Sequence, residues 1–347
     1  MVGLDIEAGS VAAAEVAGHN GSTVITGSGI VPLAPGAFRE GEVADSARIA
    51  EALKELFSAN RLSKRVRVGV ANQRVVVRTM RLPAIEDPKE MQAAVRFQAE
   101  EQIPMPLDQA VLEHQVVGGV PAVEGEPPKV DLVVIAARRE MIASFVEPVR
   151  RAGLEPVGVD LSAFGMIRAL GEVGAVAEDG SRTVETILYC NVGDVMNLAV
   201  ARGRSCLFTR VANSGLETIA ARLATERGLS TEHAVQWLAH VGLETPIETV
   251  AGDPETVGAA RRVLEEGAGA MVDDLRLSLD YYGAQEGAIA VDRIVVCGPG
   301  SGIAGLGQRM ESGLGLTVSP ATPSPLTGLP EAAASRLTLP FGLALEN

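Results

Sequence analysis

Short apolar runs separated by polar turns open the chain and predict a β-meander. The runs 2–6, 11–16 and 23–25 have the length and apolar character of strands. A glycine-containing stretch separates the first two runs, and Asn20-Gly21, between the second and third, is typical of a tight hairpin. The N-terminal segment is therefore predicted to form three consecutive strands.

Helical spacing follows in two segments that both begin at an aspartate. Apolar residues recur every three to four positions over 49–57, after Asp45 and Ser46, either of which can cap the helix. A second helix is predicted after Asp87, because Pro88 suits the first helical position and Pro104 ends the pattern. The charged face of this second helix is interpreted as a solvated surface, with a partner-binding face as the alternative.

The opening order of elements recurs about 185 residues later. Strands are predicted at 187–191, 195–201 and 205–211, with a glycine-containing turn after the first and a helix over 216–227 at the end. A long helix from Asp253, a strand over 293–297, a strand over 316–318 and a final helix over 337–345 complete the chain. An internal repeat of architecture predicts two related lobes.

Composition narrows the class of protein. The chain has 347 residues, which favours two domains, and 47% of them are apolar, which supplies ample core material. Only 3% are aromatic and the formal net charge is −14, so nucleic acid is not an expected partner. Three scattered cysteines, no long apolar run and no signal-like N-terminus predict a soluble cytoplasmic protein.

Three glycine-containing turns are candidate phosphate or nucleotide contacts. Backbone N–H groups and a hydroxyl can bind phosphate, and a carboxylate can face Mg²⁺. An ordinary hairpin or strand-to-helix turn is the alternative explanation for each. The candidate nucleotide-binding residues are Asp5, Gly9 and Ser10 in the first turn, Asn191 and Gly193 in the second, and Gly298 and Gly300 in the third, with Asp5 also the candidate Mg²⁺ ligand.

Several segments carry a resemblance to a known family. They are Val2-Gly3-Leu4-Asp5, Met80-Arg81-Leu82-Pro83, AVRFQAEEQIPMP at 94–106, AARRE at 136–140, AGLEP at 152–156 and LSLDYY at 277–282. With them the sequence resembles the actin-like ATPase superfamily, which includes actin and sugar kinases. Within it the chain is similar to the PilM family of type IV pilus assembly proteins, relatives of the cell-division protein FtsA.

The resemblance implies an α/β fold of the actin-like (ribonuclease H-like) type, with two lobes around a nucleotide cleft and an inserted 1C-type subdomain. The implied division places lobe 1A at 1–82 and 158–185, the 1C-type subdomain at 83–157, lobe 2 at 186–335, and a C-terminal helix returning to lobe 1A at 336–347.

The resemblance also implies a role as a cytoplasmic scaffold or adaptor of a pilus or related secretion machine. Its implied partner is the cytoplasmic N-terminal peptide of a PilN-like inner-membrane protein, which would recruit the chain to the inner face of the membrane. Other pilus assembly proteins are implied partners, a homo-oligomer is possible, and ATP with Mg²⁺ would be the cofactors of an intact cleft.

Departures from the family pattern argue against ATP hydrolysis. Glu7 and Ala13 stand where the first turn of the family has glycine and lysine, Asn191 replaces an aspartate, and Pro299 interrupts the third turn. A carboxylate about 5 Å from a phosphate charge costs on the order of 3 kcal/mol at an effective dielectric of about 20. Little or no ATP hydrolysis is therefore expected.

Three other classes compete with the adaptor. An active actin-like ATPase or small-molecule kinase would need a complete phosphoryl-transfer site, which these departures leave incomplete. An FtsA-like protein would need a membrane-binding helix after a linker, whereas Asn347 follows soon after the last predicted helix. A Rossmann dehydrogenase would carry its glycine motif after the first strand and not near residue 298.

Overall fold

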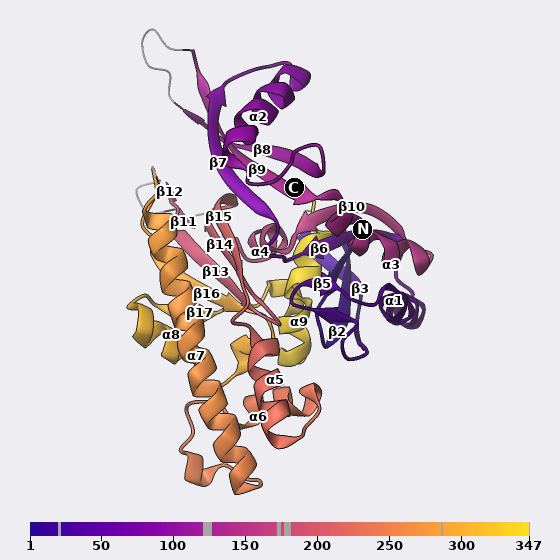
Figure 1. The fold of residues 1–347 in the computed structure, drawn as a ribbon, viewed down its shortest axis with the longest axis vertical. Helices are drawn as coiled ribbons and strands as arrows, with labels where there is room; N and C mark the ends of the chain where they lie inside the picture. The colour runs from indigo at the N-terminus through magenta and orange to yellow at the C-terminus, as the bar shows by residue number, and fades with distance from the viewer. Residues whose placement is uncertain (20–21, 121–126, 172–174, 177–181, 286, 347) are drawn as a thin grey trace.

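The computed structural model describes residues 1–19, 22–120, 127–171, 175–176, 182–285 and 287–346. The predicted Asn20-Gly21 turn lies outside these residues. The described chain forms two five-stranded sheets with helices against them and a smaller three-stranded sheet at one end (Figure 1). Measured against the length and hydropathy that a bilayer crossing requires, every helix in the described part of the chain falls short.

The first lobe is built on a sheet with the strand order β10-β6-β1-β2-β3. β1 pairs antiparallel with β2 and parallel with β6, so the predicted meander is present. The strands are β1 (Val2–Ile6), β2 (Ser10–His19), β3 (Ser22–Pro32), β6 (Arg65–Val70) and β10 (Glu155–Leu161).

Strand alternation sorts the residues of β1 between the two faces of this sheet. Val2, Leu4 and Ile6 pack with α1 (Ser46–Asn60) and α3 (Arg139–Arg151) on one face. The opposite face is covered by α9 (Glu331–Ala344), which packs so closely that a Cβ on Gly3 would overlap the Pro340 carbonyl oxygen. Asp5 lies on this same face.

An inserted module forms the end of the molecule at the top of Figure 1. Its sheet has the order β7-β9-β8, and α2 covers one face with a core of its own. Asp87 caps α2 by accepting from the N–H groups of Lys89 and Glu90, as its sequence predicts. The elements are β7 (Val76–Pro83), α2 (Pro88–Gln102), β8 (Ala110–Val120) and β9 (Lys129–Arg138).

The second lobe repeats the meander in a sheet of order β15-β14-β13-β16-β17. Helix α6 was not expected from the sequence, and β17 begins two residues later than predicted. The strands are β13 (Thr186–Val192), β14 (Met196–Arg202), β15 (Ser205–Ala212), β16 (Arg293–Cys297) and β17 (Val318–Pro320), and the helices are α5 (Leu216–Arg227), α6 (Thr231–Val241), α7 (Pro254–Gly283) and α8 (Leu306–Leu314).

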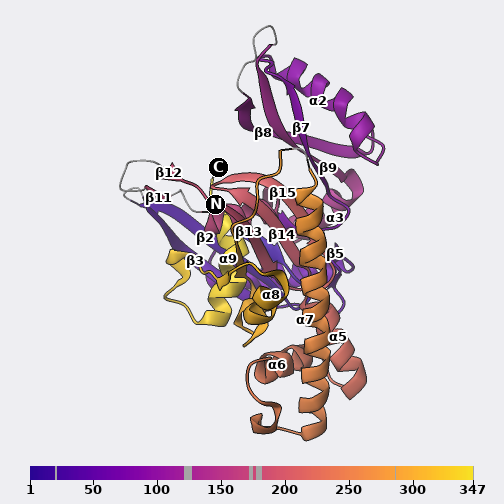
Figure 2. The same cartoon turned by 90° about the vertical axis from the view of Figure 1, so that its left-hand side faces the viewer.

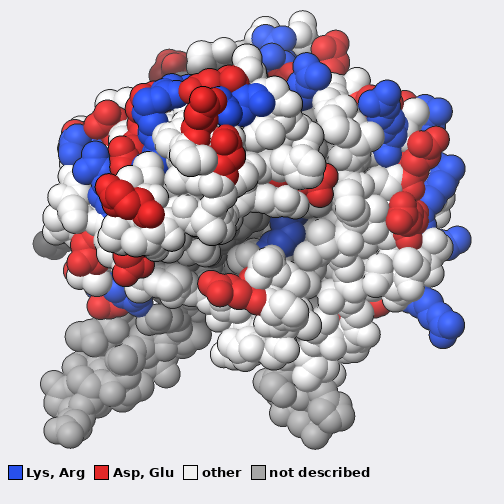
Figure 3. Space-filling model, turned by 90° about the horizontal axis from the view of Figure 1, so that it is seen from below, with Lys and Arg blue, Asp and Glu red and all other residues white. Residues whose placement is uncertain are grey.

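Ion pairs brace α5 against α7 at the free end of this lobe. Arg262 contacts Glu226 at 2.5 Å and Glu266 at 3.3 Å, and Arg222 also pairs with Glu266. Seen from that end, acidic and basic side chains lie interspersed on the surface, and the face is hollowed near its centre (Figure 3).

The two lobes meet across α4 (Ser162–Leu170) and α9, which lie between the sheets (Figure 1), and α9 can also be followed in Figure 2. Ala163, Met166 and Ile167 of α4 share a buried cluster with Ile187 and Tyr189 of β13. The final helix begins at Glu331, six residues earlier than predicted, because small alanines at 332–334 extend it. Short elements complete the chain: β4 (Phe38–Arg39), β5 (Glu42–Val43), β11 (Ala175–Val176), β12 (Arg182–Thr183), η1 (Ile247–Thr249), η2 (Pro299–Gly302) and η3 (Ser324–Leu326).

The predicted domain ranges stay a prediction, and packing shows how the elements group. The small sheet already includes β7 from Val76, because β7 pairs with β9 along its whole length. Phe145 and Val149 of α3 belong to the core of the first lobe, although they fall inside the range 83–157.

Candidate functional site

The candidate site lies where the turns after β1 and β13 meet between the lobes. In β13, Ile187 and Tyr189 face α4, so alternation also turns Asn191 towards this side of the second sheet. Asp5 occupies the corresponding place in the first lobe. Both side chains are buried, at 4% exposure each.

Arg336 of α9 makes hydrogen bonds to several groups of the first turn. Its Nη1 donates to Asp5 Oδ2 at 2.6 Å and its Nε donates to Ser10 Oγ at 2.9 Å. Its Nη2 donates to the carbonyl oxygens of Ser10 at 3.0 Å and Asp5 at 3.3 Å. Nε also lies 3.2 Å from Glu7 Oε2, and the Arg336 side chain is only 7% exposed. All three nitrogens of the guanidinium therefore donate to the same turn.

The second turn contacts the first directly. The backbone N–H of Ala8 donates to Asp194 Oδ2, across 186 residues of sequence. A Cβ on Gly193 would overlap Glu7 Oε1, so glycine at this position lets the carboxyl group approach the second turn. The second turn is itself fixed by α5, since Leu216 donates its N–H to the Gly193 carbonyl at 2.8 Å.

The third turn packs behind the second. Gly298 has φ +82°, and a Cβ on it would overlap Asn191 Oδ1. A Cβ on Gly300 would overlap Val192 Cγ1 and lie 3.0 Å from the Val192 carbonyl oxygen. Close backbone packing thus accounts for both glycines.

The chemistry of the site is set by carboxyl groups around one guanidinium. Burial raises the pKa of Glu7 to about 8, against the lowering effect of Arg336, and Asp194 and Asp5 raise it further. Burial also raises the pKa of Asp194 to about 6, and the Ala8 N–H opposes that rise. At pH 7 the Glu7 carboxyl is therefore mostly protonated, which differs from the charged carboxylate expected from sequence.

Asp5 is engaged on both carboxylate oxygens. Oδ2 accepts from Arg336, and Oδ1 lies 3.5 Å from the Ser162 hydroxyl that donates to it. A search of the described residues finds no group of three His, Cys, Asp or Glu side chains arranged to hold a metal ion.

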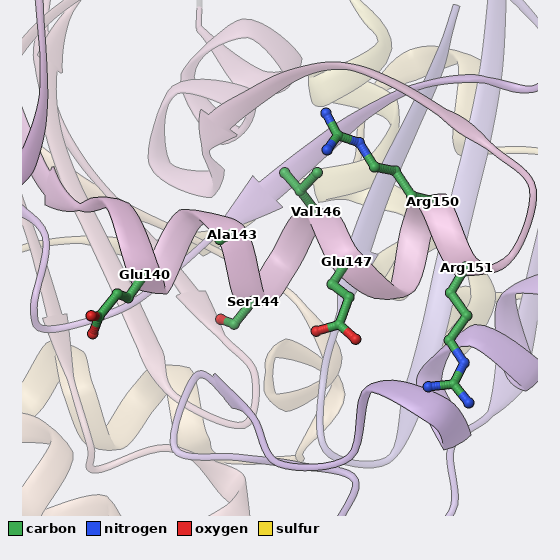
Figure 4. A pocket seen from close by; sticks show the side chains of 7 residues that line it. All are labelled: Glu140, Ala143, Ser144, Val146, Glu147, Arg150 and Arg151. Carbon is green, nitrogen blue, oxygen red and sulfur yellow. The ribbon is translucent and has the colours of Figure 1, made fainter.

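A separate surface hollow of about 850 Å³ runs along α3 (Figure 4). Its lining comes from that helix and includes none of the turn residues. The lining residues are Glu140, Ala143, Ser144, Val146, Glu147, Arg150 and Arg151. One helix face of mixed charge gives no second wall to orient a ligand, so the meeting point of the turns is the stronger candidate.

Comparison with known proteins settles the family. The model of the family described as type IV pilus assembly protein PilM matches residues 3–339. This chain belongs to the PilM family. The expected resemblance is thereby confirmed over nearly the whole chain.

Solved structures agree with the family assignment. The structure of a PilM-PilN type IV pilus biogenesis complex is 25% identical, covers 99% of this chain and 97% of that chain, and has a TM-score of 0.79. EutJ, an ethanolamine utilization protein from Carboxydothermus hydrogenoformans, is 14% identical over 99% of this chain and 88% of its own, with a TM-score of 0.55. MreB5 of Spiroplasma citri bound to ADP is 12% identical over 98% and 94%, with a TM-score of 0.51. The last two likenesses show the fold alone, and the predicted actin-like α/β fold with an inserted subdomain is confirmed.

In this PilM family member most of the predicted site residues come together. Asp5 and Ser10 meet at Arg336, Gly193 meets the Glu7 carboxyl, and Gly298 and Gly300 pack on the second turn beside Asn191. Gly9 is the exception, because it is exposed and a Cβ on it would have no atom within 4 Å. Whether any of these residues binds nucleotide stays a prediction.

Sequence reasoning missed Arg336 and gave Asp194 no role. The signal for Arg336 is an arginine that is the sole charged residue after the first position of the helix, in the run AAASRLTLPFGLA at 332–344. A lone charged residue in an apolar helix is almost never buried without a partner. That pattern predicts a buried ion pair, although it does not say with which residue.

Proposed function

We propose that this protein is a cytoplasmic adaptor of a type IV pilus or related secretion machine. In this role it binds the cytoplasmic N-terminal peptide of a PilN-like inner-membrane protein, which recruits it to the inner face of the membrane. Membership of the PilM family and the likeness to a PilM-PilN complex across 99% of the chain support this role.

The proposal includes little or no ATP hydrolysis. The supporting observation is that the groups a Mg-triphosphate would need are engaged by the protein itself. Asp5 Oδ2 accepts from Arg336, and the Ala8 N–H donates to Asp194. The Glu7 side chain occupies the space between the first turn and Gly193 and lies 3.2 Å from Arg336. These residues do not fit a Mg-triphosphate in the arrangement described.

A phosphate-release assay with Mg-ATP tests the hydrolysis clause. We expect turnover no faster than that of Asp5→Ala, because Asp5 is held by Arg336 and is not available as a metal ligand. Turnover that Asp5→Ala abolishes would show an active ATPase and would end this part of the proposal.

A pull-down with the N-terminal peptide of the cognate PilN-like protein tests the partner clause. We expect retention at tens of micromolar peptide, and none with a scrambled peptide of the same composition. Absence of binding there would contradict the adaptor role without bearing on hydrolysis.

A further inference from the structure

Three segments far apart in sequence meet at one point between the lobes. They are the turn after β1, the turn after β13 and the first half of α9, and 186 and 331 residues separate the groups that bond. The partners are Asp5, Glu7 and Ala8 in the first lobe, Asp194 in the second, and Arg336 in α9. We call this set the inter-turn latch.

Within the latch, a carboxylate of the protein takes the place of a phosphate, and a guanidinium takes the place of a cation. The Ala8 N–H, a backbone donor of the kind that binds phosphate oxygens, donates to the Asp194 carboxylate. The Arg336 guanidinium brings a positive charge against Asp5 at 2.6 Å and Glu7 at 3.2 Å.

The hydrogen bond between Ala8 and Asp194 joins the lobes. Arg336 has a different part, because it holds the first turn in the position from which Ala8 can donate. α5 supports Asp194 from behind, because Glu217 donates its N–H to the Asp194 carbonyl at 3.3 Å. The Glu217 side chain in turn accepts from the Glu40 N–H of the first lobe at 3.1 Å, which gives a second bond between the lobes at the rim.

We infer that the inter-turn latch holds the two lobes closed without nucleotide, with Asp194 in place of a phosphate and Arg336 as the positioning residue of the first turn. This inference goes beyond the adaptor role, since closure of the lobes and binding of a peptide are measured separately. It also differs from a merely stabilising ion pair, because it predicts a change in the distance between lobes.

Distance measurement between spin labels tests the inference. One label is placed at Glu55→Cys on α1 and the other at Thr225→Cys on α5, both exposed, while the three native cysteines are buried. In the full chain without nucleotide we expect one narrow distance distribution, which Mg-ATP leaves unchanged.

Variants of the latch supply the decisive comparison. Asp194→Ala is expected to lengthen and broaden the distribution, because the Ala8 N–H loses its acceptor. Asp194→Asn is expected to keep it narrow, because the amide oxygen can still accept. Asp160→Asn is the matched control, since it weakens the 2.5 Å pair with Arg168 inside the first lobe.

Two results would overturn the inference. One is an Asp194→Ala distribution as narrow as that of the unmodified latch, in protein whose circular dichroism shows it to be folded. The other is a broad distribution in the nucleotide-free protein that narrows when Mg-ATP is added, which would assign closure to the nucleotide. Because the test rests on Asp194, it needs no substitution of Arg336.

Discussion

Glu7 shows how burial changes the chemistry of a single carboxyl group. It stands at a position where the family pattern has glycine, and its side chain is 13% exposed beside Arg336. Burial outweighs the attraction of the guanidinium and raises the Glu7 pKa to about 8. The turn therefore carries a neutral hydrogen-bonding group at pH 7.

The Glu7 pKa predicts a specific pH dependence of stability. Between about pH 4.5, the ordinary value, and about pH 8, the folded state holds a proton that the unfolded chain has released, so the free energy of unfolding falls as pH rises. Glu7→Gln lacks this proton. Between pH 5 and pH 8.5 the free energy of unfolding of Glu7→Gln should therefore rise by at least about 1 kcal/mol relative to that of wild type, since one pKa unit is worth about 1.4 kcal/mol.

Urea unfolding at a series of pH values measures this difference. Glu7 also raises the pKa of Arg336 and of the Cys297 thiol, so the difference between the two curves reports Glu7 together with its effect on these neighbours. Glu55→Gln, on the exposed face of α1, controls for a general loss of charge. Parallel curves for wild type and Glu7→Gln would show that Glu7 does not titrate as described.

A pair of glycines in the two turns gives a second prediction. A Cβ on Gly193 would overlap the Glu7 carboxyl and lie 3.0 Å from Asn191 Nδ2, whereas a Cβ on Gly9 would meet nothing within 4 Å. Gly193→Ala should lower the free energy of unfolding by about 1–3 kcal/mol. Gly9→Ala should change it by less than about 0.5 kcal/mol. Equal effects of the two substitutions in thermal unfolding would contradict the described contact.

At the scale of elements, α9 is the helix on which the site depends. It packs on β1 and α4 and carries Arg336 to the first turn. Its close approach relies on glycines, because a Cβ on Gly3 would overlap the Pro340 carbonyl oxygen and a Cβ on Gly342 would overlap that of Gly165. A small shift of α9 would therefore move Arg336 away from Asp5.

Gly3→Ala tests the dependence of the site on α9. The new methyl group meets backbone atoms and not a flexible side chain. We therefore expect the free energy of unfolding to fall by about 3 kcal/mol or more, and Tm to fall by several degrees. Gly18→Ala in β2, where a Cβ would have no neighbour within 4 Å, is the matched control. A Gly3→Ala protein as stable as the control would show that α9 does not pack as described.

How much the sequence predicts depends on how local the determining contacts are. Asp45 and Asp87 cap the helices expected of them, because a cap bonds only to residues two or three positions away. The two meanders also follow from local patterns. Arg336, in contrast, bonds a residue 331 positions away, and no local pattern identifies that partner. The protonation of Glu7 depends on burial created by three distant segments, so it too required the structure.

At the scale of the whole molecule, a shared core and contacts between turns join the two lobes. Ala163 and Met166 of α4 pack with the second sheet, and Asp194 reaches the first turn from the other side of the interface. With these groups engaged by the protein, we expect the lobes to come together without nucleotide. Partner binding should then proceed without it.

Isothermal titration calorimetry with the N-terminal peptide of the cognate PilN-like protein tests this central claim most directly. The full chain is titrated once without nucleotide and once with Mg-ATP. The account predicts binding in both titrations with the same Kd within about twofold. Absence of binding, or binding that appears only with Mg-ATP, would contradict it.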